Sequence, residues 1–244
     1  MSYRNPVRAV GVVGTVTTVA GGTTTPKGPK YRGVSAVQIG NFNSTLTIST
    51  PAATVVGDLL VVINNTRTPP GASMSSEWTA VTAQVDPNTN TQVAYWTKKA
   101  GTQDAGGNGS YVISGESNGT GSLAVMLAIS DGTSIAVKSP AASFVNGGSA
   151  TVTTPSVDKD ALVLFVAASR AYDAAPTFAW GPSGPPTPQP AITEASKAYL
   201  PFSSANGALT VAYTNANWTP AASYGATCTN NGNSYGIATT VVVS

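Results

Sequence analysis

The stretch ISTPAATVVGDLLVVINNTR, residues 48–67, carries the pattern that decides the fold. Polar and apolar residues alternate up to a Thr-Pro pair, a turn with Asp58 follows, and a continuously apolar run comes next. The alternation predicts a strand with one buried face, whereas the apolar run predicts a strand covered on both faces or lying at a subunit contact. Residues 152–170, VTTPSVDKDALVLFVAASR, repeat this order. Because a Pro-rich loop and a Trp follow each stretch, we interpret the pair as the two-fold internal plan of a two-sheet fold.

The rest of the chain consists of short runs rich in Val, Ile, Leu and Thr, separated by turn-forming clusters. Apolar residues do not recur at the spacing of three and four that predicts a helix, and 25 Gly and 17 Pro interrupt the sequence throughout. This pattern is typical of a sandwich or barrel. About a dozen strands are expected, at residues 44–50, 58–65, 77–85, 91–100, 109–117, 122–130, 149–157, 161–169, 191–199, 207–215, 223–231 and 236–244.

The continuously apolar runs supply the predicted core, because both of their faces must be removed from water. The residues that we place there are Leu60, Val62, Val125, Leu127, Leu162, Leu164 and Val166. Bulky aromatic residues near strand ends are interpreted first as core fillers and only second as ligand platforms. These residues are Trp78, Tyr95, Trp96 and Trp180.

The composition favours a protein that is built into an assembly. A chain of 244 residues permits one generous domain or two small ones, and 41% hydrophobic residues support a packed core. Only 9% of the residues are charged, against about 25% in an ordinary soluble domain. The exterior must therefore consist largely of Ser, Thr, Asn and Gly, and such a weakly charged surface repels its neighbours poorly.

Positive charge is concentrated at the start of the chain. Residues 1–57 carry five cations and no acid, whereas the remainder carries seven cations and ten acids, a net charge of −3. We expect an extended N-terminal arm at residues 1–35, followed by a single β-sandwich domain at residues 36–244. The cations expected to anchor this arm to a partner are Arg4, Arg8, Lys27, Lys30 and Arg32.

The arm is too poor in apolar residues to order itself, because fixing a backbone costs roughly 1–2 kcal/mol per residue. We expect it to be ordered on a partner, where its alternating VGVVGTVTTV would add strand hydrogen bonds and its cations would meet an acidic surface. The alternative is that the cations only keep an extended segment soluble. Nucleic-acid binding is not expected, since the cations are not clustered and lack interleaved aromatic residues.

The chain offers little for catalysis, and no enzyme, metal or cofactor is expected. Histidine is absent, so the usual triads of Ser or Cys nucleophiles cannot form, and the single Cys228 excludes an intrachain disulfide or a thiolate metal site. Asp158 and Asp160 are the closest acids, in a turn where acids commonly cap. Glycoside hydrolysis by this pair, or calcium binding together with Asp173, are the minor alternatives.

Membrane insertion and secretion are not expected either. No run approaches the roughly twenty apolar residues of a membrane helix. The opening MSYRNPVRAVGVVGTVTTVAGG has charges before an apolar run, but Gly and Thr dilute that run too much for a signal peptide.

Eight segments follow one another over residues 36–244, in the order PAATVVGDLL, EWTAVTAQ, VAYWTKKA, GSYVISG, LAVMLAISDG, TVTTPSV, ALVLFVAAS and YGIATTVVV. In these segments the sequence resembles a jelly-roll-like β-sandwich module of bacteriophage virion proteins and some bacterial surface proteins. Glu77 replaces the Gly of the family's Trp turn, and an inserted Pro-rich loop follows Trp180. The resemblance implies a fold and a virion location, and it brings no catalytic residues.

The resemblance implies a non-enzymatic structural protein on the exterior of a phage particle. Capsid decoration, as a cement protein held by its arm, is the first expectation, and a tail or fibre component is the second. The implied partners are the major capsid protein, other virion proteins and copies of itself, with a trimer compatible with the apolar strands. The competing hypothesis is a carbohydrate-binding module for a host glycan, in which loops present Trp78, Trp180 and Trp218.

Overall fold

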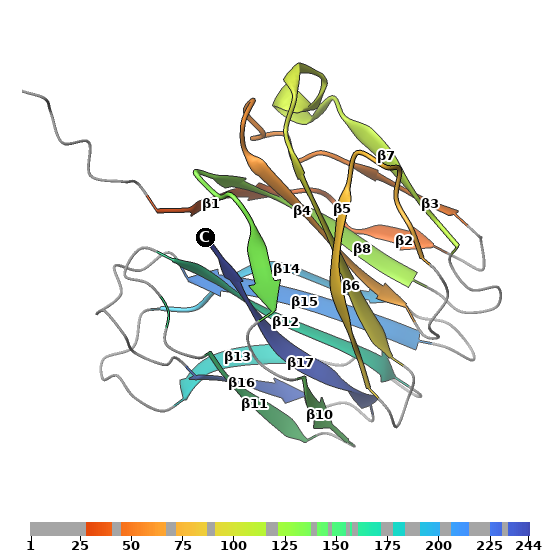
Figure 1. Ribbon diagram of the computed structural model, residues 1–244. Helices are drawn as coiled ribbons and strands as arrows, with labels where there is room; N and C mark the ends of the chain where they lie inside the picture. Colours follow the sequence, from red (N-terminus) through yellow and green to blue (C-terminus); the bar gives the residue numbers. More distant parts are fainter. Residues whose placement is uncertain are drawn as a thin grey trace, which may run out of the picture.

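The computed structural model describes residues 28–40, 45–66, 72–86, 91–115, 122–137, 141–145, 148–154, 157, 161–171, 178–183, 191–200, 206–214, 225–230 and 234–244. In these ranges the regular structure is almost entirely β, and the paired strands run antiparallel (Figure 1). The expected all-β, antiparallel sandwich is confirmed.

The described part of the chain divides into two halves of similar length. The first half contains β1 (Lys30–Val34), β2 (Gln38–Gly40), β3 (Thr45–Ser49), β4 (Leu59–Thr66), β5 (Thr79–Val85), β6 (Gln92–Lys99), the 3-10 helix η1 (Thr102–Gly107), β7 (Ser110–Ser114) and β8 (Ser122–Ser130). The second half contains β9 (Ile135–Val137), β10 (Ala142–Phe144), β11 (Ser149–Thr153), β12 (Leu162–Ala171), β13 (Phe178–Ser183), β14 (Thr193–Leu200), β15 (Asn206–Thr214), β16 (Gly225–Asn230) and β17 (Ser234–Val243).

The two halves follow one topological plan. The inner sheet of the first half has the order β1-β8-β4-β6-β5, with β2 also paired to β8. The inner sheet of the second half has the order β10-β17-β12-β15-β14, with β9 also paired to β17. Each half adds a small outer sheet, β3-β7 in the first and β11-β16-β13 in the second. The internal plan expected from the two Thr-Pro stretches is therefore present, since β3 and β4 correspond to β11 and β12.

The four sheets stack as layers with three apolar cores between them (Figure 1). A central core lies between the two inner sheets and joins residues such as Val61 and Leu127 to Leu164 and Val241. An outer core of the first half lies under β3-β7, and an outer core of the second half lies under β11-β16-β13. The inner sheets therefore have apolar neighbours on both faces.

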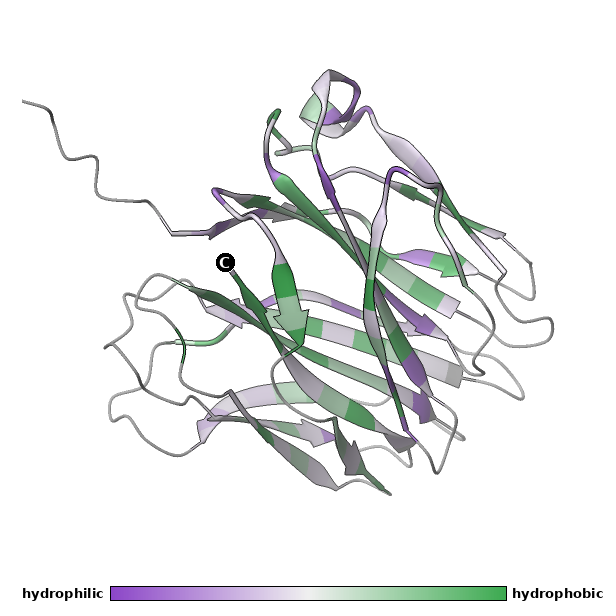
Figure 2. Cartoon of the chain, in the orientation of Figure 1, coloured by the Kyte–Doolittle hydropathy of each residue, from purple (hydrophilic) through white to green (hydrophobic). Residues whose placement is uncertain are grey.

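This layering explains why β4, β8 and β12 are continuously apolar. Alternate side chains of a strand point to opposite faces, so Val61 of β4 enters the central core while Val62 enters the outer core. Figure 2 shows hydrophobic residues along these inner strands. All the residues predicted for the core are fully buried: Leu60, Val62, Val125, Leu127, Leu162, Leu164 and Val166.

The two halves are also joined by polar and aromatic contacts. The Asn65 side-chain amide of β4 donates a hydrogen bond to the Ala208 carbonyl of β15, at 3.0 Å in the buried interior. Tyr31 of β1 stacks on Tyr213 of β15, with ring centroids 4.0 Å apart. The connection from β8 to β9 is held against the end of the chain, because Ser134 and Ser244 exchange backbone hydrogen bonds of 3.1 Å.

The end of the expected N-terminal arm belongs to the first inner sheet. Lys30–Val34 form β1 and pair with β8, and the Arg32 guanidinium lies 2.8 Å from the buried Asp58 carboxylate. Residues 1–35 are thus not all outside the sandwich: the alternation of Tyr31 and Arg32 gives one side chain to the central core and the other to the rim. Residues 1–27 lie outside the described residues.

The outer sheets differ by one strand. In the second half, β13 pairs along the whole of β16. In the first half, the corresponding side of β7 carries, as far as the described residues go, an isolated bridge, in which Ser73 and Ser114 exchange backbone hydrogen bonds of 2.9 and 2.8 Å. Within the described residues, the two outer sheets thus differ in how this side is paired.

The predicted strands were found at all twelve positions, with ends shifted by a few residues. Five further strands were not predicted: β1, β2, β9, β10 and β13. Four of these are short edge strands that pair with β8 or β17, and β13 contains a Gly-Pro pair. Such segments have too little alternation to be distinguished from loops by sequence pattern alone.

A buried lysine cluster as the candidate functional site

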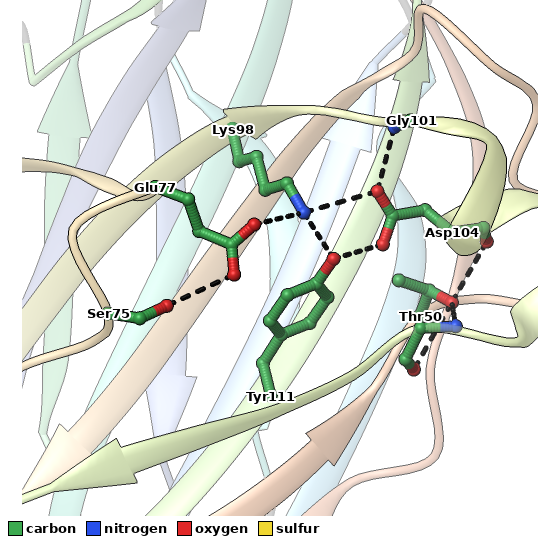
Figure 3. Close-up of polar contacts among 8 residues, drawn as sticks. Thr50, Ser75, Glu77, Lys98, Gly101, Asp104 and Tyr111 are labelled. Atoms are coloured by element: carbon green, nitrogen blue, oxygen red, sulfur yellow. Dashed lines mark hydrogen bonds and ion pairs between the residues drawn. The ribbon is translucent and has the colours of Figure 1, made fainter.

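A dense group of charged and polar side chains gathers at one end of the first outer core (Figure 3). Lys98 at the end of β6 lies at its centre, with Glu77 before β5, Asp104 in η1 and Tyr111 in β7 around it. These residues come from four separate segments, so only the folded chain brings them together.

Lys98 is almost fully enclosed, with 8% of its side chain exposed. Its Nζ lies 2.8 Å from Glu77 Oε2 and 3.3 Å from Asp104 Oδ2, and it donates a hydrogen bond to the Tyr111 hydroxyl. The ammonium thus has three acceptors for its three protons. It also lies 4.3 Å from the centre of the Tyr111 ring and 5.9 Å from that of Trp78, in reach of cation–π attraction.

Asp104 is fully buried, and each of its carboxylate oxygens has a donor. Oδ2 accepts the Gly101 backbone N–H at 2.8 Å, which caps the start of η1, and Oδ1 accepts the Tyr111 hydroxyl. The main-chain carbonyl of Asp104 accepts the Thr50 hydroxyl at 3.0 Å. The carboxylate is therefore held in one orientation beside Lys98.

Opposing effects set the proton affinities in the cluster. Burial alone would lower the pKa of Lys98, but its hydrogen bonds to Glu77, Tyr111 and Asp104 and the charge of Asp104 outweigh this and raise the pKa. Burial raises the pKa of Tyr111, and its hydrogen bond to Asp104 acts in the same direction, while Lys98 acts against them. The resting cluster is an ammonium shared by two carboxylates, with a neutral phenol between the ammonium and Asp104.

Aromatic rings cover Lys98, whereas the Glu77 side chain is 45% exposed. Trp78 is 6% exposed and meets Tyr111 edge to face, with ring centroids 5.0 Å apart. Trp96 is also buried, two residues before Lys98 on the same face of β6. Lys98 thus follows the position pattern of a core residue, and this is the one signal in the sequence that points to the cluster.

No protein-family model matches the chain, and no curated protein or solved structure matches it.

The expected site residues fall in several places. Trp78 is a core residue and has too little exposed ring to act as a loop contact, which corrects its assignment as one. Trp180 lies in strand β13, half-buried against Phe165 at 5.8 Å between ring centroids. Lys30 is exposed at the start of β1. The other expected residues lie outside the described residues: Arg4, Arg8, Lys27, Trp218, Asp158, Asp160 and Asp173.

Nowhere in the described residues do three or more His, Cys, Asp or Glu side chains gather as metal ligands would. The same residues include no helix with the length and apolar character needed to span a bilayer.

Proposed function

We propose that the protein is a non-enzymatic structural component of a bacteriophage virion, a capsid decoration protein fastened by its N-terminal arm. The observation that carries the proposal is a layered sandwich with uncharged outer sheets, joined at edge strand β1 to an N-terminal segment that carries cations and no acids. The sandwich would face outward as a jelly-roll-like module, and the arm would bind the major capsid protein or a neighbouring copy.

Both outermost sheets support an assembly role. The exposed positions of β3 are Thr45, Thr47 and Ser49, and those of β11 are Ser149, Thr151 and Thr153. These hydroxyl faces carry no charge to repel a neighbouring subunit. A surface of this kind suits close packing on a particle better than it suits a free protein that must stay soluble at high concentration.

The edge of β7 offers a place for an added strand. The backbone groups of successive residues in a strand point alternately to its two edges. Gly109 points toward β3, where its carbonyl accepts the Thr50 N–H, and Ser114 points to the opposite edge, where it pairs with Ser73. The backbone N–H and C=O of Val112 therefore point to the same edge as those of Ser114. The described residues provide no backbone partner for Val112 there. The equivalent edge of β16 is filled by β13, so the fold accepts a strand at this position.

Deletion of residues 1–29 tests the anchor, since it spares β1 and the Arg32–Asp58 ion pair. We expect the shortened protein to fold and to be lost from purified particles. The matched control replaces Arg4, Arg8 and Lys27 with Gln, which keeps the arm's length and removes the three cations that precede β1. Full occupancy of the particle by the deletion variant would refute the arm as anchor.

A tail or fibre location is the alternative within the same class. Counting copies separates the two, because a decoration protein covers the particle surface whereas a tail component is present in few copies. The burial of Trp78 gives no support to glycan binding through that residue.

A further inference from the structure

The lysine cluster holds an amine, a carboxyl group and two groups able to exchange protons in direct contact. Lys98 Nζ lies 3.3 Å from Asp104 Oδ2, the oxygen bonded to the carbon that an amine would attack. We propose that Lys98 and Asp104 join in an intramolecular isopeptide bond, formed once per chain by the protein itself. This covalent modification goes beyond the proposed function and does not depend on it.

Proximity supplies the first requirement. An amine and a carboxyl group held in contact react as if present at about 10⁵–10⁸ M, because no translational freedom remains to be lost. Both groups are fixed here: Asp104 by the Gly101 N–H and the Tyr111 hydroxyl, and Lys98 by its three acceptors. The reacting pair is therefore assembled by folding rather than by collision.

Tyr111 supplies the proton transfer that makes the pair reactive. The reaction requires a neutral amine and a neutral carboxylic acid, whereas the resting pair is an ammonium and a carboxylate. The Tyr111 hydroxyl accepts a hydrogen bond from Lys98 Nζ and donates one to Asp104 Oδ1. One proton can thus pass from Nζ to the phenol oxygen while the phenol proton passes to Oδ1, and Tyr111 ends unchanged.

The remaining steps balance with groups already in place. The amine lone pair forms the new N–C bond to Cγ, and the charge that develops on Oδ2 is stabilised by the Gly101 N–H at 2.8 Å. Glu77, 2.8 Å from Nζ, accepts a second amine proton. That proton returns to the nitrogen and reaches the protonated Oδ1 through the Tyr111 hydroxyl, which contacts both Nζ and Oδ1. Oδ1 then leaves as water when the carbonyl at Oδ2 re-forms. Ammonium and carboxylate become an amide and water, and no oxidant or cofactor is consumed.

Burial favours the product over the ion pair. A buried charge pair must recover the cost of removing both ions from water, and the amide carries no net charge. Lys98 has 8% of its side chain exposed and Asp104 has none, so both charges of the ion pair have lost most of their contact with water.

Other ion pairs of the described residues lack this arrangement. Lys197 and Glu194, 3.1 Å apart, are both well exposed. Arg32 pairs with the buried Asp58, but a guanidinium is not deprotonated in proteins and cannot act as an amine nucleophile. Lys99, next to Lys98, binds the backbone carbonyls of Gly57 and Gly132 instead of a carboxylate. Lys99 is therefore the matched control.

The deciding experiment is the intact mass of the purified full-length protein, measured after denaturation, followed by protease mapping. We expect a mass lower than that of the sequence by one water molecule. Mapping should then yield a branched peptide that joins Lys98 to Asp104, with no cleavage after Lys98. The full sequence mass would overturn the proposal, and so would a water loss mapped to the Asp131–Gly132 pair, a sequence prone to cyclise.

Variants test the assigned roles. Lys98→Arg cannot form the amide and should show the full mass, whereas Lys99→Arg should lose water as the wild type does. Tyr111→Phe keeps the ring that packs on Trp78 but removes the proton relay, so we expect at least a tenfold lower condensed fraction. Glu77→Gln should slow condensation similarly. Complete condensation of the folded Tyr111→Phe protein would overturn the relay. Because the wild-type mass decides whether the bond exists, a variant that fails to fold leaves that result intact.

Discussion

The first half of the molecule seals its outer core with a buried lysine between two carboxylates, whereas the second half seals the equivalent space with aromatic side chains and a cysteine. The strand registers show which residue of the second half occupies the position of Lys98. Lys98 lies opposite Leu60, the second residue of β4, and Thr214 lies opposite Val163, the second residue of β12. One position of a shared plan thus carries a charge in one half and a hydroxyl in the other.

The difference accompanies a difference in strand pairing among the described residues. In the second half, β13 covers the outer core and places Phe178 and Trp180 over it. In the first half, the described residues 72–78 form the Ser73–Ser114 bridge with β7 and then turn at Ser75, bringing Glu77 to Lys98. Charged side chains thus hold this described segment to the layer below.

Removing the central charge should have the largest effect on this comparison. In Lys98→Met, Asp104 stays buried with neither its cation nor the proposed amide, so we expect the free energy of unfolding to fall by at least about 3–5 kcal/mol. Urea denaturation measures the change. The control Lys99→Met removes only bonds to backbone carbonyls. An equal loss of unfolding free energy in both variants would show that the buried cluster contributes no more to stability than these bonds do.

The second half should respond to polarity rather than to charge. Cys228 is fully buried in the outer core of that half, so Cys228→Ser introduces a buried hydroxyl and should cost about 1–3 kcal/mol. Cys228→Ala is the control, since it changes volume without adding a polar group. If Ser were tolerated better than Ala at this position, the apolar character assigned to this core would be wrong.

The same thiol gives a pH-dependent probe. Burial raises the pKa of Cys228 from its ordinary 9.0 to about 12, with a small opposing effect from Lys197. The neutral thiol therefore contributes stability below pH 9 that is lost as the pH rises toward 12. At pH 9 we expect alkylation of Cys228 to be slow in the folded protein and fast in urea. Rapid labelling without denaturant would contradict the burial of this core.

The rim of the first inner sheet should be less sensitive. Arg32→Ala breaks the ion pair with Asp58, whose carboxylate also accepts the Val55 N–H at 2.8 Å. Because Arg32 is partly exposed, we expect a loss of about 1 kcal/mol. Lys30→Ala, at an exposed position of the same strand, is the control. Thermal unfolding that is identical for both variants would argue against a structural role for the Arg32 contact.

The smallest effect on stability is expected at the open edge of β7. Val112 is 47% exposed, so Val112→Lys should change the free energy of unfolding by no more than about 0.5 kcal/mol. A charge on this edge should nevertheless hinder strand addition and lower incorporation into particles. Thr79→Lys, at an exposed position of β5 outside the two outer sheets, is the control. Equal incorporation of both variants would exclude the β7 edge as an assembly contact.

The sequence predicts the central strands well because each contains an uninterrupted run of apolar residues. Runs such as those of β4, β8 and β12 have no polar face, and only a strand covered on both sides satisfies them. By contrast, β13 was missed because Pro182 argues against a strand. The structure tolerates it since β13 pairs with β16 alone and leaves its other edge free of ladder bonds among the described residues.

The lysine cluster was less predictable. Trp96 and Lys98 share a face of β6, so the enclosure of Lys98 could have been inferred from alternation. Its partners could not, because Glu77 and Asp104 reach it from a turn and a 3-10 helix whose paths depend on the layer above. Pairing between such segments is set by tertiary packing and leaves no periodic signal.

The central core has a consequence for how such a molecule is held together. Each half alone would expose the apolar face of its inner sheet to water, and the surface that fits this face is the inner sheet of another half with the same topology. Linkage through residues 131–134 makes that encounter internal to one chain, so dilution cannot separate the units. Two fragments cut at this linker would regain the same fold only above a threshold concentration, where the single chain has none.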